Sequence, residues 1–413
     1  MTDNKDNIEH SNTDNIDLES FMGESGGSGE FMCFRAPGRV NLIGGHTDYN
    51  DGFVLPVAID RAVYLLARPR TDRNVRVYSC NFGEKSQFHL DSIDYNKNIQ
   101  WINYLQGVAY FLQENGCEFK GMDIVIRGEV PRGAGLSSSA ALEMAAGCAF
   151  NHIYDLGLGP VELAHIARRA EKNFVGVSCG IMDQLISALG KKNHALFIDC
   201  RTLDFTPVRI EDLDYKILVA NTRVEHSLAD TAYNERQEQC ERGVQYFDRW
   251  LNHPVKALRD VNIGELKKYE DRLPRIISSR CRHVIEENER VHDCRRALEN
   301  DDLAAVGRLL IDSHRSLRDL YEVSCEELDL MVDLALEVEG VLGARMTGAG
   351  FGGSTVNLVH REAIEDFKEY AATGYQQKTG IEPEIHSCEI VSGCGRVEMT
   401  AQPGGEDFVC CSD

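Results

Sequence analysis

The chain has 413 residues, of which 43% are hydrophobic, and its formal net charge is −22 at neutral pH. This length exceeds the size at which single hydrophobic cores stop growing, so we expect two domains. The acidic excess argues against a nucleic-acid or membrane partner, because such a partner needs a broad basic surface. A phosphorylated ligand would have to be bound by local cations, backbone amides and metal.

The cysteines and the N-terminal region favour a cytoplasmic location. The 14 cysteines form no C-x-x-C pair, and most stand alone, so we expect reduced thiols. Cys281, His283, His292 and Cys294 come nearest to a metal cluster, but their spacings match no zinc pattern. No apolar run approaches the roughly 20 residues of a membrane helix, and the polar N-terminus lacks a signal-peptide core. We expect residues 1–29 to be disordered.

The first glycine-rich loop runs from Pro37 to Gly52, after an extended run at Met32 to Ala36, and carries Arg39, His46 and Asp48. Such a loop can place polar side chains beside a small ligand. The alternative is an ordinary loop whose Asp48 makes turn hydrogen bonds. Strands are then predicted at Val54 to Pro69 and Val75 to Ser79, and an amphipathic helix at Trp101 to Gln113.

The second glycine-rich stretch is Pro131-Arg132-Gly133-Ala134-Gly135-Leu136-Ser137-Ser138-Ser139-Ala140. It follows an apolar strand, Met122 to Val130, and precedes a helix, Ala140 to Phe150. A glycine turn that leads into a helix leaves backbone N–H groups unpaired and favours negative charge, which makes it a phosphate cradle. The serines can also cap the helix. A well-capped helix after a tight turn, with no ligand, is the alternative.

Asp183 is the third candidate feature. Helices are predicted at Pro160 to Val175 and Met182 to Leu189, and the short turn between them, Gly176 to Ile181, delivers this single carboxylate to a helix start. An Asp at that place is most often a cap. A strand at His194 to Cys200 follows.

The second half begins with a strand, Tyr215 to Asn221, and a polar segment that contains Tyr233. Helices then extend to about Glu339. The predicted elements that end the chain are a strand at Val341 to Thr347, a glycine loop at Gly348 to Gly353, a strand at Ser354 to His360, a helix at Glu362 to Thr373 and a strand at Glu384 to Val391. This order indicates an α+β sandwich.

The late glycine loop matches G-x-G-x-x-G, but a strand follows it where a dinucleotide site needs a helix. The sequence also has no G-x-x-x-x-G-K-[ST], H-R-D or D-F-G motif, which argues against the two commonest kinase designs.

Six motifs nevertheless stand in a fixed order: Pro37-Gly38-Arg39-Val40-Asn41-Leu42-Ile43-Gly44, His46-Thr47-Asp48-Tyr49-Asn50, Trp101-Ile102-Asn103-Tyr104, Gly135-Leu136-Ser137-Ser138-Ser139-Ala140, Cys179-Gly180-Ile181-Met182-Asp183-Gln184 and Met346-Thr347-Gly348-Ala349-Gly350-Phe351-Gly352-Gly353. Together with Asp312 to Asp319 they resemble the GHMP kinases and, within that family, the galactokinases. The resemblance extends from about Phe34 to Val391.

The resemblance implies an α+β, two-domain GHMP kinase fold with the active site in the cleft between the domains. The N-terminal domain, 30–205, would be ribosomal-protein-S5-like, and the C-terminal domain, 206–413, a ferredoxin-like α/β sandwich. The implied reaction is transfer of a phosphoryl group from ATP to the anomeric hydroxyl of D-galactose, which gives α-D-galactose 1-phosphate and ADP for the Leloir pathway. We expect a monomer with ATP, Mg²⁺ and the sugar as its ligands.

The resemblance also implies roles for individual residues. The catalytic pair would be Asp183, which accepts the sugar hydroxyl proton, and Arg39, which keeps that carboxylate ionised and contacts the transferred phosphoryl group. The implied sugar-binding residues are Gly45, His46, Thr47, Asp48, Gly180 and Tyr233. The implied ATP-binding residues are Gly133, Ala134, Gly135, Leu136, Ser137, Ser138, Ser139 and Ala140. Ser139 and Glu171 would hold Mg²⁺, and the late glycine loop would shape the cleft.

One position departs from the galactokinase pattern. These enzymes usually carry Glu, which binds the far hydroxyl of the sugar, where this chain has Gly45. The loss removes one hydrogen bond, about 0.5–1.5 kcal/mol net, and is expected to open space in the pocket. A relative of galactose altered at C6, such as galacturonate, is therefore an alternative substrate. The sequence also leaves open a non-catalytic sugar sensor and a mevalonate or homoserine kinase.

Overall fold

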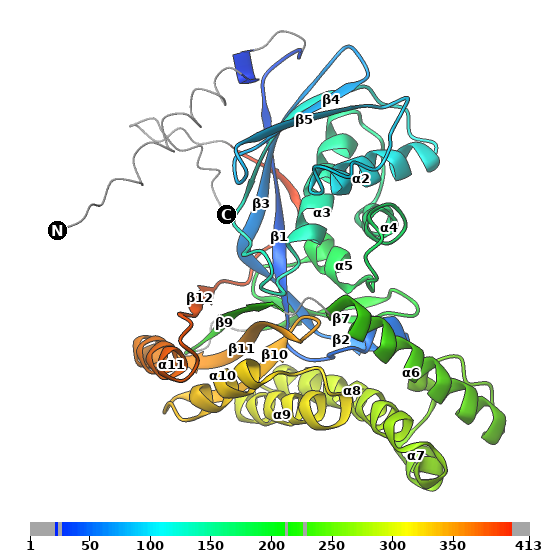
Figure 1. Ribbon diagram of the computed structural model, residues 1–413, viewed down its shortest axis with the longest axis vertical. Helices are drawn as coiled ribbons and strands as arrows, with labels where there is room; N and C mark the ends of the chain where they lie inside the picture. The colour runs from blue at the N-terminus through cyan, green and yellow to red at the C-terminus, as the bar shows by residue number, and fades with distance from the viewer. Residues whose placement is uncertain (1–20, 24–26, 211–213, 226–228, 399–413) are drawn as a thin grey trace.

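The first of two stacked units is built on a six-stranded sheet (Figure 1). The computed structural model describes residues 21–23, 27–210, 214–225 and 229–398. The strands of this sheet, in spatial order, are β13 (Gly395–Val397), β1 (Met32–Asn41), β3 (Pro56–Pro69), β6 (Met122–Gly128), β4 (Asn74–Ser79) and β5 (Glu84–His89). Neighbours pair antiparallel except β4 and β6. Because β13 pairs with β1, the end of the described chain returns to the first sheet.

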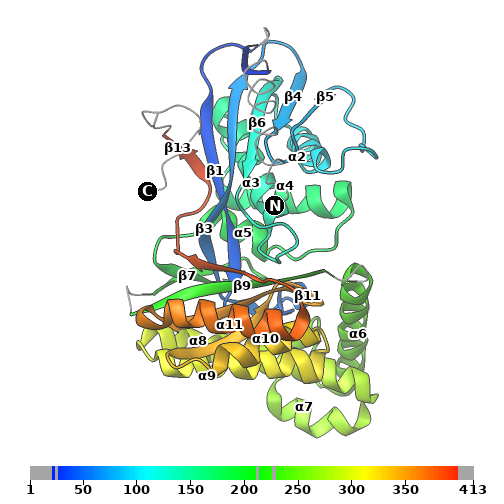
Figure 2. The ribbon, with the colours of Figure 1, turned by 60° about the vertical axis from the view of Figure 1, so that its left-hand side comes forward.

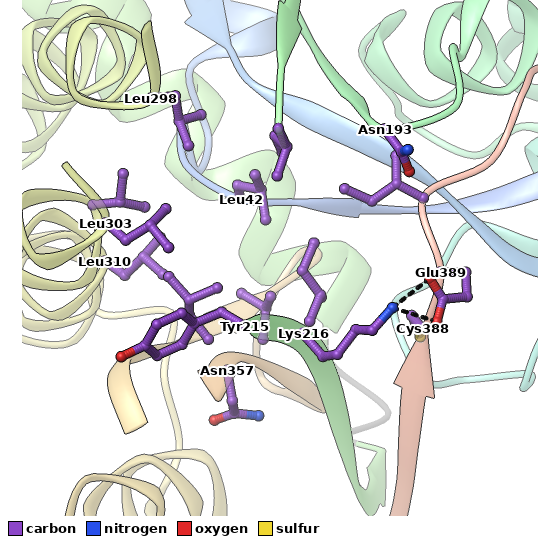
Figure 3. Close-up of a pocket in the computed structure, with 16 residues that line it drawn as sticks. Leu42, Asn193, Tyr215, Lys216, Leu298, Leu303, Leu310, Asn357, Cys388 and Glu389 are labelled. Atoms are coloured by element: carbon purple, nitrogen blue, oxygen red, sulfur yellow. Dashed lines mark hydrogen bonds and ion pairs between the residues drawn. The ribbon is translucent and has the colours of Figure 1, made fainter. Parts of the chain in front are cut away.

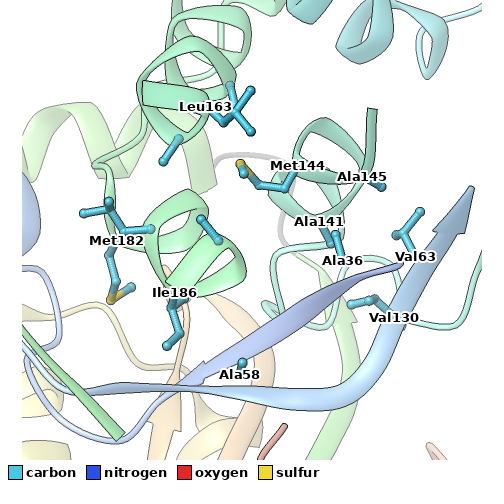
Figure 4. Packing of buried hydrophobic residues seen from close by; sticks show 14 of the residues in the cluster. Ala36, Ala58, Val63, Val130, Ala141, Met144, Ala145, Leu163, Met182 and Ile186 are labelled. Carbon is cyan, nitrogen blue, oxygen red and sulfur yellow. The ribbon is translucent and has the colours of Figure 1, made fainter. Parts of the chain in front are cut away.

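Four helices cover one face of this sheet: α2 (Ile102–Glu114), α3 (Ser138–Ile153), α4 (Pro160–Arg169) and α5 (Met182–Leu189). Alanines such as Ala141 and Ala145 on α3 let the helix approach the strands closely. Met144 extends from α3 toward the neighbouring helices, and Ile186 extends from α5 toward the strands near Ala58 (Figure 4). This packing holds the N-terminus of α3 and the N-terminus of α5 over the end of β1. Both predicted catalytic segments therefore start from the same rigid core.

Two further features of the first unit are a three-stranded sheet and a bulge in β1. The three-stranded sheet has the order β2 (Phe53–Val54), β7 (His194–Asp199) and β8 (Phe205–Arg209). In β1 the pairing with β3 shifts register between Pro37 and Arg39. Such a bulge redirects the following side chain, and here that side chain is Arg39.

The second unit is a four-stranded antiparallel sheet backed by helices. Its strands are β10 (Val341–Thr347), β11 (Gly352–His360), β9 (Tyr215–Glu225) and β12 (Glu384–Cys388), in that spatial order. Its helices are α6 (Ala229–Trp250), α7 (Ile263–Tyr269), α8 (Arg275–Glu299), α9 (Leu303–Ser316), α10 (Glu326–Leu336) and α11 (Ile364–Thr379). Helices α8 to α11 lie on the side of the sheet that faces away from the first unit (Figure 2). The strand order is that of a ferredoxin-like sandwich.

The predicted α+β fold, with two domains and a ferredoxin-like sandwich as the second, is confirmed. The structure adds three short strands that the sequence analysis did not expect, β5, β8 and β13. The predicted disordered segment, residues 1–29, lies mostly outside the described residues, although Phe21 within it is buried and its ring centroid lies 5.9 Å from that of Tyr78. The exact domain limits remain a prediction. None of the helices in the described part of the chain combines the length and the apolar character that a membrane span requires.

The expectation of reduced thiols holds for most of the described cysteines, which are free. It is wrong for Cys33, which is disulfide-bonded. His283, considered above as part of a metal cluster, is instead hydrogen-bonded through both ring nitrogens to Ser316 and to the carbonyl of Gly45.

Candidate active site

Arg39 and Asp183 form the centre of the site. The Nε and Nη2 atoms of Arg39 each donate to one carboxylate oxygen of Asp183 at 2.7 Å, and Nη1 donates to the carbonyl of Gly135 at 2.5 Å. Ser137 donates its hydroxyl to the same carboxylate. Asp183 does not cap α5, whose N-cap is Ile181 without a side-chain hydrogen bond. The carboxylate is therefore held in one orientation, and its side chain remains 27% exposed.

The second glycine-rich stretch, Pro131 to Ala140, is called the serine-rich loop from here on. It leaves the N-terminus of α3 without a side-chain cap, contrary to the capping role considered for its serines. Ser137 has a left-handed backbone, with φ of 61° and ψ of 49°, a conformation that non-glycine residues adopt at a cost and that is common at ligand sites. Its hydroxyl is used by Asp183 instead. Uncapped amides at a helix N-terminus suit a phosphate group.

Ser139 and Glu171 lie together as the resemblance implies. The hydroxyl of Ser139 donates to Oε1 of Glu171 at 2.7 Å. Glu171 belongs to a π-helical turn, Ala170–Val175, a local feature frequent at functional sites. Burial raises the pKa of Glu171, and the negative charge of Asp183 adds to this effect. A hydroxyl and a carboxylate are hard oxygen donors, so this pair fits Mg²⁺.

Two buried side chains that the sequence analysis did not single out support Glu171. Gln184 donates through Nε2 to Oε2 of Glu171 at 2.6 Å and to Oε2 of Glu143 at 3.2 Å. Gln184 and Glu143 have no exposed surface, and burial raises the pKa of Glu143 well above its ordinary value. Gln184 follows Asp183 directly in the helix, so it couples the position of the catalytic candidate to that of the metal-binding candidate.

All of the predicted sugar-binding residues except Thr47 line a pocket of about 130 Å³. Its lining includes Arg39, Asp48, Gly180, Asp183 and Tyr233, together with glycines of the first and last glycine loops. The pocket therefore brings together residues from both units of the fold, as a cleft site requires.

Asp48 and Gly180 are in close contact. A Cβ atom on Gly180 would lie 1.8 Å from Oδ2 of Asp48, so only glycine leaves room for the carboxylate there. Burial and the nearby charge of Asp183 raise the pKa of Asp48 to about 6. Tyr233 packs against the same loop, with its ring centroid 4.9 Å from that of Tyr49.

The first glycine-rich loop, Pro37 to Gly52, is called the sugar loop from here on. His46 and Thr47 contribute to the shape of this loop more than to its polar surface. His46 donates through Nε2 to the carbonyl of Ala349 at 2.9 Å, so Nδ1 accepts from the hydroxyl of Tyr49. Burial lowers the pKa of His46 to about 3, which keeps the ring neutral. Thr47 is buried, and its hydroxyl lies 3.0 and 2.7 Å from the carbonyls of Gly44 and Phe53.

Helix α8 holds the sugar loop from the side of the second unit. Oε1 of Glu287 accepts hydrogen bonds from the amides of Gly44 and Gly45 and from the hydroxyl of Ser313, at 2.6 to 3.1 Å. Its other oxygen accepts from Arg290 at 2.6 Å. Burial alone would raise the pKa of Glu287, but the charge of Arg290 and other neighbours lowers it well below the ordinary range. The sequence analysis did not identify Glu287; the sequence shows only that this helix is rich in charged residues.

The structure corrects the expectation that Gly45 opens space. A Cβ atom on Gly45 would lie 2.9 Å from Nη2 of Arg345 and 3.1 Å from both methyl groups of Leu317. The volume that a side chain at this position would begin to fill is therefore occupied by residues of the second unit.

The late glycine loop packs on the serine-rich loop. A Cβ atom on Gly348 would lie 3.1 Å from the Cα atom of Gly135, and Ser354 donates its hydroxyl to the carbonyl of Ala134 at 2.6 Å. The loop thus closes the cleft between the two units and is a tight connection between two strands, as expected.

A larger pocket of about 440 Å³ adjoins the serine-rich loop through Ser138 and Ser139. Its aromatic lining residues are Phe82, Trp101 and Tyr104, and the rings of Phe82 and Trp101 stack with centroids 6.0 Å apart. The guanidinium of Arg132 lies 4.4 Å from the centroid of Phe82. A flat aromatic base could bind here with its phosphates at the loop. Among these lining residues, Trp101 and the serines belonged to motifs that the sequence analysis quoted, whereas Phe82 did not.

A third pocket, of about 70 Å³, lies where β9 meets α9 and the segment after β12 (Figure 3). Most of its lining is apolar, including Leu42, Leu303 and Leu310, and Lys216 pairs with Glu389 at its edge. The described residues that line it include none of the predicted site residues.

The fold and the site define a small-molecule kinase whose phosphate loop is rich in serine and lacks lysine. Family models agree: the GHMP kinases N terminal domain matches residues 103–191, the GHMP kinases C terminal domain matches 294–377, and the galactokinase galactose-binding signature matches 19–69. The galactokinase of Roseiflexus sp. (strain RS-1) is 46% identical over 372 residues, which cover 90% of this chain and 94% of the relative. The galactokinase of Chloroflexus aggregans is 49% identical over 346 residues, 84% of this chain and 88% of the relative.

Among solved structures, Lactococcus lactis galactokinase complexed with galactose superposes with a TM-score of 0.88 at 34% identity. The match covers 92% of this chain and 98% of that chain. The chain belongs to the galactokinase family of GHMP kinases.

Proposed function

We propose that the protein phosphorylates the anomeric hydroxyl of D-galactose with ATP and produces α-D-galactose 1-phosphate and ADP. The observation that carries the proposal is the pairing of Arg39 with Asp183 at 2.7 Å in a pocket that also presents Asp48, Gly180 and Tyr233. Family membership and the galactose-binding signature over residues 19–69 support galactose as the sugar.

ATP would bind with its base in the 440 Å³ pocket beside Phe82 and Trp101. Its phosphates would lie along Gly133 to Ala140, against the uncapped amides of α3. Ser139 and Glu171 would hold Mg²⁺, which when bound neutralises phosphate charge as the phosphoryl group moves. Ser137 links the two pockets, because it donates to Asp183 of the sugar pocket and precedes Ser138, which lines the larger pocket. This link supports direct transfer.

Asp183 would accept the proton of the anomeric hydroxyl as that oxygen attacks the terminal phosphorus. Arg39 and Ser137 fix the orientation of the carboxylate, and Arg39 places a positive charge beside the transferred phosphoryl group. Phosphoryl transfer depends mainly on alignment and on charges placed before the reaction begins. In this site the bidentate ion pair between Arg39 and Asp183 would supply both the alignment and the charge.

A sensor role and a different substrate receive less support. A non-catalytic sensor would not need the combination of Arg39, Ser139, Glu171 and Asp183, which the structure brings together. The similarity to galactokinases over most of the chain does not favour a kinase specialised for galacturonate, or one for mevalonate or homoserine. A cytoplasmic monomer remains a prediction.

The function can be tested by offering the purified protein a panel of hexoses with ATP and Mg²⁺ and measuring ADP release. We expect galactose to give the highest kcat/KM. Mevalonate and homoserine are offered as controls. If none of the hexoses led to ADP release, or if only mevalonate or homoserine did, the proposal would be contradicted.

A further inference from the structure

A short segment, residues 389–394, returns the chain from the second unit to the first and leads into β13 (Figure 2). Its backbone is bound to the first unit, since the amide of Val391 donates to the carbonyl of Ala58 at 3.0 Å and the amide of Cys394 donates to the carbonyl of Ser187 at 2.7 Å. β13 has three residues and forms the edge of the six-stranded sheet beside β1. So short an edge strand has little stability of its own, and its position depends on the residues that flank it.

Cys394, the residue directly before β13, contacts Cys148 of α3. The two residues are 246 positions apart in the chain, yet their Sγ atoms lie 2.6 Å apart. Both thiols are free and half-buried. A disulfide has an S–S bond of about 2.04 Å. The sulfurs therefore need to approach each other by only about 0.6 Å to form such a bond.

The alternative is that the two thiols pack as small apolar side chains and share a weak S–H hydrogen bond. Carbon atoms that are not bonded stand about 3.5–4.0 Å apart at their optimal separation, and sulfur is the larger atom. A separation of 2.6 Å is nearer to a covalent bond than to such a contact. The distance therefore favours a pair arranged for oxidation over a pair of packed thiols.

A second cysteine beside β13 is already oxidised. Cys33 of β1 is disulfide-bonded, and it lies opposite Val397, the last residue of β13. The pair of Cys148 and Cys394 stands at the other end of this strand, since Gly395 follows Cys394 directly. The disulfide of Cys33 is evidence, independent of the distance between the two free sulfurs, that cysteines in this region are oxidised.

We propose that Cys148 and Cys394 form an oxidative modification site, where a disulfide fastens the start of β13 to α3. The chemical class of the oxidant is a small disulfide, such as oxidised glutathione. The proposal is independent of the proposed function, because neither cysteine lines any of the three pockets described above.

The bond forms by two successive thiol–disulfide exchanges. The hydrogen bond with Cys148 and burial raise the pKa of Cys394, so Cys148 reacts first. Its thiolate attacks one sulfur of oxidised glutathione, the S–S bond of glutathione breaks, and one glutathione leaves and takes up the proton. The sulfur of Cys394 then attacks the mixed disulfide at Cys148, which forms the new S–S bond and releases the second glutathione with the second proton. Two electrons thus pass from the two cysteines to one molecule of oxidised glutathione, which becomes two thiols.

The cross-link is expected to stabilise the fold without changing catalysis. It joins residues 246 positions apart, and a disulfide restricts the unfolded chain more as the closed loop lengthens. Cys394 is bound to Ser187, near the end of α5, whereas Asp183 lies at the start of this helix. We therefore expect the oxidised protein to keep its activity.

The first test identifies the bond in the full-length, unaltered protein. The folded protein is incubated with oxidised glutathione, the remaining thiols are alkylated, and its peptides are identified by mass spectrometry without reduction. We expect a linked pair of peptides that contain Cys148 and Cys394, and dithiothreitol added before alkylation should remove the link. Alkylation of both cysteines after oxidation, or glutathione on each of them without a link, would overturn the proposal.

The variants Cys148→Ser and Cys394→Ser test the fastening of β13. Each variant and the unaltered protein are compared after incubation with oxidised glutathione and after reduction; all three retain Cys33, so its disulfide contributes equally. We expect oxidation to raise the melting temperature of the unaltered protein by about 2–7 °C more than that of either variant. Hydrogen exchange in the peptide that carries β13 should slow on oxidation of the unaltered protein only. Equal temperature shifts and equal exchange in all three proteins would overturn the proposal.

Discussion

Arg39 and Asp183 stand 144 positions apart in the chain, yet the guanidinium of Arg39 holds both oxygens of the Asp183 carboxylate at 2.7 Å. The bulge in β1 directs Arg39 into the cleft, and the turn before α5 brings Asp183 to meet it. The pair defines where the sugar hydroxyl and the transferred phosphoryl group must meet.

Replacing Asp183 by Asn removes the proton acceptor while keeping the size of the side chain. We expect turnover to fall by about 10²–10⁴, the range for a positioned general base, with the melting temperature little changed. Steady-state kinetics with galactose and ATP measure the effect. Asp319→Asn, which alters an exposed carboxylate paired with Arg318, is the matched control. Near-normal turnover of the Asp183 variant would remove this residue from the mechanism.

The raised pKa of Asp48 gives the sugar site a pH dependence. Its carboxylate titrates at about 6 instead of its ordinary 3.8 because of burial and the charge of Asp183. The ionised form can accept a hydrogen bond from a sugar hydroxyl, so we expect KM for galactose to rise as pH falls through about 6. Asp48→Asn should lack this step. A KM profile with the same step in both proteins would assign it to another group.

The same shift predicts the sign of a stability effect. Between pH 3.8 and about 6 the native Asp48 retains a proton that the unfolded chain releases. The contribution of Asp48 to the free energy of unfolding therefore decreases as pH rises through this window. Comparing urea denaturation of the unaltered protein and Asp48→Asn across the window measures it. If the free energy of unfolding of the unaltered protein instead rose with pH relative to that of Asp48→Asn, the raised pKa would be contradicted.

Gln184 is expected to position Glu171 for the metal ion. Gln184→Met keeps the length of the side chain and removes the donor to Glu171 and Glu143. Loss of a partner that orients a metal ligand typically costs about 10- to 100-fold in metal affinity. Binding of Mn²⁺ in the presence of ATP, followed by electron paramagnetic resonance, reports this directly. Gln237→Met on the exposed side of α6 should bind Mn²⁺ like the unaltered protein, and equal affinity in both variants would argue against the role of Gln184.

Glu287 is expected to stabilise the sugar loop from the second unit. Glu287→Gln removes the buried carboxylate that accepts from the loop amides, Ser313 and Arg290, and leaves Arg290 only the longer ion pair with Glu286 at 3.7 Å. We expect a loss on the order of 3 kcal/mol in the free energy of unfolding. KM for galactose should rise more than kcat falls, because the loop at Gly44 and Gly45 loses its anchor. Glu286→Gln, one position earlier and partly exposed, should cost less than about 1 kcal/mol. Similar losses in the two variants would contradict the anchoring role.

The sequence predicts the parts of this molecule that have strong local signals. The glycine loops, the long strands and α2 to α5 follow from glycine spacing and apolar periodicity, and the motif order indicates the family. The strands β5 and β8 were missed because most of their residues are exposed, so neither shows the alternation of a half-buried strand.

The contacts that shape the site depend on packing between distant segments, which a single sequence does not reveal. Glu287 and His283 look like surface residues of a charge-rich helix until α8 is placed against the sugar loop. The π turn that presents Glu171 has no sequence signal. Gly45 was expected to leave a space, but the neighbour that fills it, Arg345, is 300 positions away in the sequence numbering.

The central claim is that Asp183 and the serine-rich loop together transfer phosphate from ATP to the anomeric oxygen of galactose. Phosphorus NMR of a reaction with galactose, ATP and Mg²⁺ tests it most directly. The account predicts a new sugar phosphate resonance, coupled to the anomeric proton, that grows as ATP is converted to ADP and grows about 10²–10⁴ times more slowly with Asp183→Asn. A phosphate on any other sugar oxygen, or ATP consumed to give only inorganic phosphate, would contradict it.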